Sequence, residues 1–170
     1  MSLKSLGVIA LPAVLFFYQS CKYSNTYETA NTNGKFEIQV PSWMKEDTKL
    51  KPGADFQYAN RFRNFYAIGE IEGKPGESLD SLMKFNLDVV RKSLANPIVS
   101  DSFPDTINGL GGERVEIFGK MNNENIYFSE VLLAGKQHIY HLTIWTRNED
   151  RKLKYKNDID KIFNSFKEKS

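Results

Sequence analysis

The architecture follows from residues 113–146, which read ERVEIFGKMNNENIYFSEVLLAGKQHIYHLTIWT. Their β-branched and aromatic content predicts three consecutive strands, at Glu113–Phe118, Asn125–Ala134 and Gln137–Thr146. The segments between them, Gly119–Glu124 and Gly135-Lys136, have the residues typical of hairpin turns. Because hairpins join antiparallel strands, these residues predict an antiparallel meander in the middle of a sheet.

Further strands are predicted on the N-terminal side of this meander. In Phe36–Val40, apolar residues alternate with polar ones up to Pro41, which indicates a strand with one buried face. Alternation also predicts strands at Phe56–Tyr58 and Phe65–Ile71, and Ile98–Ile107 is expected to be extended. The sheet therefore continues beyond the meander.

Two segments have helical periodicity. Apolar residues recur at helical spacing from Leu79 to Leu94, after a start at Glu77 or Ser78 and before the stop at Asn96-Pro97. A second helix is predicted over Asp150–Lys167. The order β-β-β-α-β-β-β-β-α predicts an α+β fold, with a mostly antiparallel central sheet of about six to seven strands and helices packed on it.

Composition sets the size and excludes some partners. At about 100–200 residues per domain, the 170 residues form one domain, and a hydrophobic content of 41% supplies a core. The 23 basic and 21 acidic residues leave a net charge of +2, which gives no electrostatic reason to expect nucleic acid as a partner. A single cysteine excludes internal disulfides and cysteine-based zinc clusters.

The first residues carry an export pattern. Lys4 precedes an uncharged, mainly apolar run from Leu6 to Tyr18, which has the length of a signal-peptide core and is shorter than the roughly 20 residues that span a membrane. Cys21 follows this run directly after Ser20. The arrangement resembles a bacterial lipoprotein signal, which implies cleavage before Cys21 and acylation of its thiol and new amino group. The alternative is an ordinary secretory signal with a buried cysteine.

This pattern divides the chain into three parts. Residues 1–20 are a lipoprotein signal peptide, residues 21–33 a polar tether after lipidated Cys21, and residues 34–170 the folded domain. The tether prediction rests on the Asn, Thr and Ser content of Lys22–Asn33, which shows no apolar period. By resemblance to lipoprotein sorting, Lys22 favours the outer membrane over the inner one, and we expect the domain to face the periplasm.

The segment Gly34–Trp43, GKFEIQVPSW, resembles the opening of PsbP-like domains, where a strand ends in proline and a tryptophan follows. The turn Ile107–Leu110 and the closing segment Ile162–Phe166 are also similar to that superfamily. The resemblance covers residues 34–168 and implies an α/β/α sandwich. The superfamily includes the photosystem PsbP subunit, the Ran-binding Mog protein of yeast and many bacterial lipoproteins, so it implies a fold and transfers no binding residues.

No catalytic constellation emerges from the residues. His138 and His141 are three positions apart in a predicted strand, so they point to opposite faces and do not share a metal ion; each is expected to be structural or exposed. Gly109, Gly111 and Gly112 precede a strand rather than a helix, so they indicate a turn and not a phosphate loop. The sequence therefore predicts no catalytic residue, no metal, no cofactor and no enzymatic activity.

Two clusters are candidates for binding. One interleaves aromatic residues with arginines, as interface hot spots do, and the other is the densest basic stretch, suited to lipid headgroups or an acidic partner. The partner-binding candidates are Tyr58, Arg61, Phe62, Arg63 and Tyr66. The headgroup or acidic-partner candidates are Arg147, Arg151, Lys152 and Lys154. In each case the alternative is an ordinary solvated surface.

Together these observations predict a non-enzymatic, lipid-anchored binding or scaffolding module of the bacterial cell envelope. Its partners would be the membrane, through acylated Cys21, and an envelope protein. One alternative is a carrier or sensor of a small apolar ligand, in which the abundant aromatic residues would line a cleft between sheet and helix. The remaining alternative is an envelope enzyme, which would need a cleft with converging polar residues.

Overall fold

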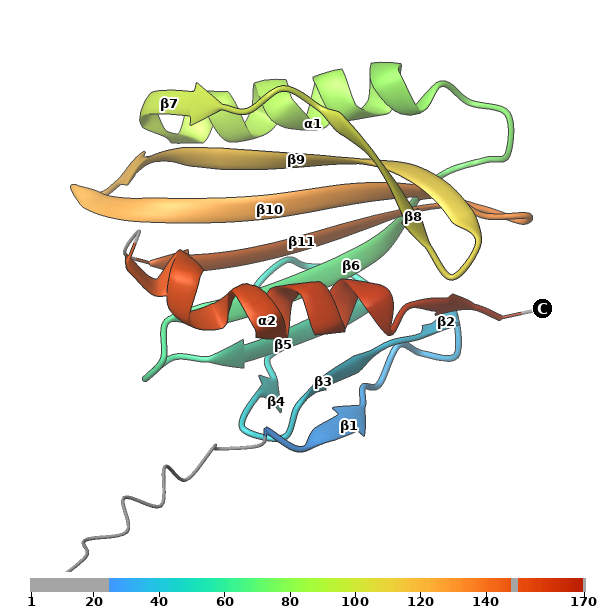
Figure 1. Ribbon diagram of the computed structural model, residues 1–170, viewed down its shortest axis with the longest axis horizontal. Helices are drawn as coiled ribbons and strands as arrows, with labels where there is room; N and C mark the ends of the chain where they lie inside the picture. The colour runs from blue at the N-terminus through green and yellow to red at the C-terminus, as the bar shows by residue number, and fades with distance from the viewer. Residues whose placement is uncertain (1–24, 148–149, 170) are drawn as a thin grey trace, which may run out of the picture.

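The computed structural model describes residues 25–147 and 150–169. An eight-stranded antiparallel sheet forms its centre (Figure 1). In spatial order its strands are β4 (Lys45–Glu46), β5 (Phe56–Asn60), β6 (Phe65–Gly73), β11 (Ile139–Arg147), β10 (Glu124–Ala134), β9 (Leu110–Met121) and β7 (Ala95–Val99). The eighth strand, β8 (Phe103–Ile107), also pairs with β9.

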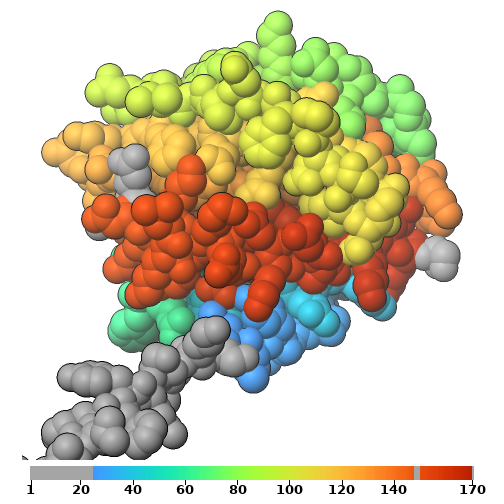
Figure 2. All heavy atoms as spheres, in the orientation of Figure 1, coloured from blue at the N-terminus to red at the C-terminus, as the bar shows by residue number. Residues whose placement is uncertain are grey.

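Two helices and two small sheets complete the fold. The helices are α1 (Leu79–Ser93) and α2 (Asp150–Asn164), and α2 crosses the front of the molecule in Figures 1 and 2. One small sheet pairs β1 (Tyr27–Thr29) with β3 (Gln39–Pro41), and the other pairs β2 (Phe36–Glu37) with β12 (Lys167–Glu168). This arrangement confirms the predicted α+β class with a mostly antiparallel central sheet.

The meander β9–β10–β11 forms the middle of the sheet, as its sequence predicts. Phe128 of β10 lies opposite Ile117 of β9 and Trp145 of β11. Alternate residues of β10 enter two separate clusters, with Tyr127 on the α2 side and Phe128 on the α1 side. The strand is therefore buried on both faces, and the sheet lies between two apolar layers.

Aromatic rings fill the layer between the sheet and α2. Phe36, Tyr140 and Phe166 are in mutual contact, with ring centroids 4.9–5.8 Å apart. Tyr155 of α2 packs against Phe65 and Trp43 at 5.1 and 5.8 Å. The apolar-ligand alternative required a cleft between sheet and helix. These side chains occupy that space, so they argue against it.

Helix α1 begins and ends at local signals in the sequence. Ser78 is its N-cap, and the Ser78 hydroxyl accepts a hydrogen bond from the Ser81 N–H at 3.3 Å. This confirms one of the two predicted starts. Met83 and, just beyond the helix, Leu94 pack on the face of the sheet opposite α2.

None of the helices in the described ranges is long and apolar enough to cross a membrane.

The N-terminal tether prediction is wrong for residues 25–33. Strand β1 pairs with β3, Ala30 lies in the main core, and the Tyr27 hydroxyl donates to the carboxylate of Asp158 in α2. Thr32 is also buried. Backbone pairing holds this polar strand, so no hydrophobic period was needed to form it. The signal peptide, Cys21 and residues 22–24 lie outside the described residues.

Two predicted boundaries also shift. The second helix ends at Asn164 rather than Lys167, because the chain then turns so that β12 can pair with β2. Of the three glycines expected in a turn, only Gly109 has the left-handed φ of +82°. Gly111 and Gly112 belong to β9 and pair with β8.

Glu168 fixes the C-terminal strand to the β10–β11 turn. Its carboxylate accepts hydrogen bonds from the N–H groups of Lys136 and Gln137, both at 2.9 Å, and from the Tyr140 hydroxyl at 3.2 Å. Partial burial alone would raise the pKa of Glu168, but these hydrogen bonds and Lys136 outweigh it and lower the pKa. The folded state therefore favours the ionised carboxylate.

We expect Glu168→Gln to lower the free energy of unfolding by about 1 kcal/mol at pH 7. A lowered pKa adds stability above the unfolded pKa of about 4.3, and this stability is lost as the pH falls through the folded pKa. The difference between wild type and variant should therefore shrink as the pH falls below about 5. Urea unfolding across this range measures it, and a difference independent of pH would refute the assignment.

Candidate functional site

One end of the sheet gathers residues from both predicted binding clusters. We call it the hairpin end: the β5–β6 turn (61–64), the β9–β10 turn (122–123), Arg147 and Arg151. The Arg151 guanidinium donates to the backbone carbonyl of Arg63, and the Arg147 N–H donates to that of Asn64 at 3.2 Å. Segments separated by more than eighty residues thus form one surface.

Phe62 is the apolar feature of the hairpin end. It is 99% exposed at the tip of the β5–β6 turn. The turn is held by backbone hydrogen bonds from Arg63 to Asn60 and from Asn64 to Arg61, and Asn64 adopts a left-handed φ of +47°. An ordered turn therefore presents a large aromatic side chain wholly to solvent, which is typical of residues that bury in a partner.

Basic groups surround this tip. Arg61 pairs with Asp47 at 2.6 Å, and Arg147 pairs with Glu124 at 3.3 Å. The Arg63 guanidinium lies 4.5 Å from the ring centroid of Trp43. An open groove on the Asn64 side of the turn, which Phe62 itself does not line, is lined by Asn64, Lys120, Asn123, Glu124, Asn125, Arg147 and Arg151. The hairpin end therefore combines an aromatic tip with a surface of mixed charge.

Some predicted binding residues lie elsewhere. Tyr58 and Tyr66 are buried: the Tyr58 hydroxyl accepts from the Asn31 N–H, and Tyr66 stacks on Trp145 at 5.1 Å. Lys152 donates to Glu116 at 2.5 Å. These three make internal contacts because strand alternation and the helix period direct them inward. Lys154 is exposed beside the Tyr155 ring. The candidates that remain at the hairpin end are Arg61, Phe62, Arg63, Arg147 and Arg151.

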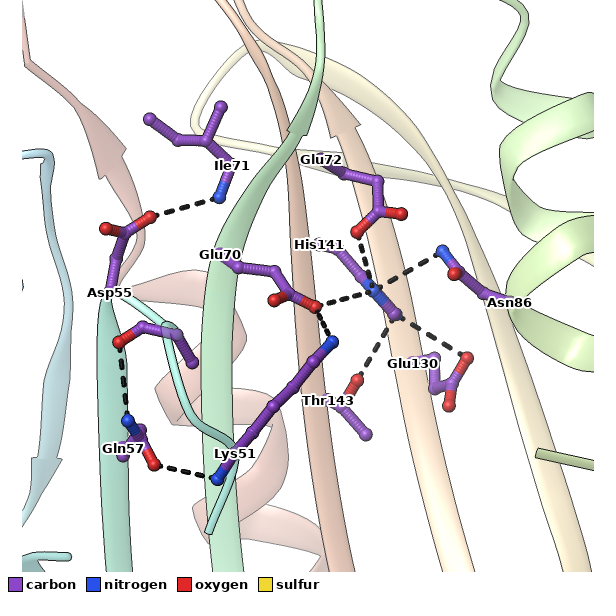
Figure 3. Close-up of polar contacts among 11 residues, drawn as sticks. Lys51, Asp55, Gln57, Glu70, Ile71, Glu72, Asn86, Glu130, His141 and Thr143 are labelled. Carbon is purple, nitrogen blue, oxygen red and sulfur yellow. Dashed lines mark hydrogen bonds and ion pairs between the residues drawn. The ribbon is translucent and has the colours of Figure 1, made fainter. Parts of the chain in front are cut away.

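A second site surrounds His141 on the α1 face of the sheet (Figure 3). Its Nδ1 lies 3.6 Å from a Glu72 carboxylate oxygen and 3.8 Å from one of Glu70, both on β6. Its Nε2 lies 3.6 Å from Glu130 Oε2 on β10. The Thr143 hydroxyl of β11 lies 3.2 Å from Nε2, and the side-chain amide nitrogen of Asn86 in α1 lies 3.4 Å from Nδ1. We call these residues, with Lys51, the His141 cluster.

Charge in the His141 cluster is concentrated and poorly solvated. Burial alone would lower the pKa of His141, but its interactions with Glu130 and Glu72 outweigh burial and raise the pKa to about 9. The interaction with His141 in turn lowers the pKa of Glu72. The Lys51 ammonium pairs with Glu70. Glu130 is 1% exposed, and its Oε2 has no hydrogen-bond partner among the described residues.

Sequence reasoning missed the His141 cluster. Alternation alone places Glu70 and Glu72 on one face of their strand, but only the β6–β11 register puts His141 opposite Glu70. Glu130 joins from a third strand, where it faces Thr143. His138 takes no part, because β11 begins at Ile139 and His138 lies in the preceding turn. The residues of the cluster lie on three strands, and the pairing of these strands cannot be predicted from the sequence.

Comparisons with known proteins identify the fold. No family model and no curated protein matches the sequence. Among solved structures, the cyanobacterial PsbP (CyanoP) of Synechocystis sp. PCC 6803 is similar, with a TM-score of 0.60 and 15% identity over 98% of this chain and 99% of that one.

Two further structures have the same architecture. LpqN of Mycobacterium tuberculosis gives a TM-score of 0.58 at 9% identity, over 85% of this chain and 91% of its own. The Ran-binding protein Mog1p of Saccharomyces cerevisiae gives 0.57 at 11% identity, over 84% and 95%. These matches confirm the predicted PsbP-like fold. At such low identities they show a shared fold and do not show a shared function.

Proposed function

We propose that this chain is a non-enzymatic binding module of the bacterial cell envelope, anchored by an acylated Cys21 to the outer membrane and facing the periplasm. Its binding surface is the hairpin end. The observation that carries the proposal is the complete exposure of Phe62 on an ordered turn beside Arg61, Arg147 and Arg151. Aromatic residues and arginines are the residue types that dominate binding energy at protein interfaces.

The envelope location rests on two supports. The lipoprotein-like pattern places the only cysteine at the end of a short apolar run. The structurally similar LpqN is described as involved in cell envelope biogenesis. Strand β1 begins only six residues after Cys21, so an anchored domain would lie close to the membrane surface.

The charge pattern favours a protein partner over lipid headgroups. Arg61 and Arg147 already pair with Asp47 and Glu124, so the hairpin end presents both signs of charge around Phe62. An anionic lipid surface would repel these acids, whereas a protein can match a mixed pattern with complementary groups. We therefore assign the surface to an envelope protein whose contact residues are apolar and carry charges of both signs.

Replacement of the aromatic tip tests this function. We expect Phe62→Ser to reduce capture of envelope proteins by the anchored full chain by about 30-fold, as for a hot spot of about 2 kcal/mol. Phe85→Ser is the matched control, since Phe85 is 63% exposed on α1. Quantitative mass spectrometry of cross-linked envelope fractions measures both variants. Equal capture by the two variants would contradict the assignment, and enrichment of anionic lipid alone would favour headgroup contact.

A further inference from the structure

The His141 cluster places ligand atoms at the spacing of a metal centre. Ligand atoms of Glu70, Glu72 and His141 all lie within 4.8 Å of one another. Nδ1 of His141 is 3.6 and 3.8 Å from the nearest glutamate oxygens. A tetrahedral ion with bonds of about 2.1 Å separates its ligand atoms by about 3.4 Å. The two distances from Nδ1 to the glutamate oxygens, 3.8 and 3.6 Å, exceed that spacing by about 0.4 and 0.2 Å.

Glu130 supplies an independent indication. Its side chain is 1% exposed and its Oε2 has no hydrogen-bond partner among the described residues, yet this atom points at Nε2 of His141 from 3.6 Å. Histidines that bind a metal through one ring nitrogen usually donate the other N–H to a carboxylate, which fixes the ring and makes it a better ligand. Glu130 can take this part at Nε2, which also lies 3.2 Å from the Thr143 hydroxyl.

The charge of the His141 cluster also favours a bound dication. Glu70, Glu72 and Glu130 carry three negative charges around one histidine, and Lys51 offsets one of them through Glu70. A dication in front of Nδ1 would neutralise the remaining two when the imidazole is neutral. Glu70 and Glu72 are 16% and 18% exposed, so an ion and a water ligand can reach them from solvent.

We propose that Glu70, Glu72 and Nδ1 of His141 bind one divalent transition-metal ion of the zinc class, with Glu130 holding the ring from behind. An imidazole with two carboxylates suits Zn²⁺ better than Mg²⁺ or Ca²⁺, which prefer oxygen alone. On binding, the Nδ1 proton leaves to solvent, and Lys51 stays beside Glu70, where it offsets one of the three glutamate charges. The site ties β6 to β11 on the α1 face and is separate from the proposed binding surface at the hairpin end.

Zinc titration of the full chain tests the site. The protein is purified in mild detergent with a histidine-free tag, stripped with chelator, and titrated with Zn²⁺ against a chromophoric competitor. We expect one ion per chain by native mass spectrometry, and visible absorption of tetrahedral type with Co²⁺. Glu72→Gln should weaken Zn²⁺ binding roughly 100-fold and Glu130→Gln roughly 10-fold, whereas Glu37→Gln, on the surface of β2, should leave it unchanged.

Histidine variants give a matched pair. His141→Gln should abolish binding, and His138→Gln should preserve it. If His141→Gln does not fold, Glu72→Gln still tests zinc binding. This variant should fold, because it removes one of three crowded carboxylates and keeps the side-chain shape. The proposal is overturned if the wild type binds neither ion at micromolar concentration, or if Glu72→Gln and Glu37→Gln bind Zn²⁺ equally well.

Discussion

We expect Cys21→Ala to release the protein from the membrane fraction into the aqueous supernatant. The proposed attachment is the acyl lipid on Cys21, at the end of the short apolar run. Each buried CH₂ of an acyl chain contributes about 0.8 kcal/mol, and one chain binds only marginally whereas two or more anchor stably. Removing the acylated thiol should therefore reduce membrane partitioning by several orders of magnitude.

Membrane sedimentation and detergent phase separation measure this effect, and intact-protein mass spectrometry measures the acyl mass on Cys21. Lys22→Ala is the control, because it changes the neighbouring residue and leaves the thiol. A mature wild-type protein with an unmodified Cys21 would refute the anchor. So would a Cys21→Ala protein that sediments with the membrane as the wild type does.

Gly112→Ala should destabilise the domain by about 3 kcal/mol, at the upper end of the usual cost of overpacking. Gly112 lies in β9 between β8 and β10, opposite Leu133. A Cβ there would lie 2.2 Å from the backbone oxygen of Leu132 and 2.8 Å from the Leu133 side chain. Since the nearest atom belongs to the backbone, relief requires β9 and β10 to move apart.

The adjacent glycine is the matched control. A Cβ at Gly111 would meet no atom within 4 Å, and Gly111 has no left-handed φ, so Gly111→Ala should change the free energy of unfolding by less than about 0.5 kcal/mol. At roughly 2–4 °C per kcal/mol, Gly112→Ala should lower Tm by about 6–12 °C. Thermal unfolding of the two variants gives the comparison, and equal Tm values would show that β9 and β10 are not paired in this register.

The parts of the fold that the sequence predicted have local signals. Residues 113–146 alternate strands with hairpin residues, and Ser78 stands directly before a helical period. Strand β1 has no such signal, since Tyr27–Thr29 is mostly exposed and is held by backbone pairing with β3 and by Asp158 of α2. Polar strands that depend on distant partners are not visible in local periodicity.

The candidate sites also differ in whether their residues have a local signal in the sequence. The sequence could name Phe62 and its neighbouring arginines as candidates, because a turn with aromatic and basic residues is a local pattern, and the structure adds that Phe62 is exposed. Tyr58 and Tyr66 could not be separated from them until strand alternation and packing were known. The His141 cluster required the register of three strands, and in β6–β11 that register shifts between Ile139 and Tyr140.

Site-specific photo-cross-linking tests the proposed binding surface most directly. A photoreactive phenylalanine analogue replaces Phe62 in one strain and Phe85 in another, each in the anchored full chain in its native envelope. We predict a discrete protein adduct from position 62 that position 85 does not form, and its loss when Arg147 and Arg151 are both replaced by glutamate. No adduct at position 62, or the same adduct from both positions, would contradict a binding surface at the hairpin end.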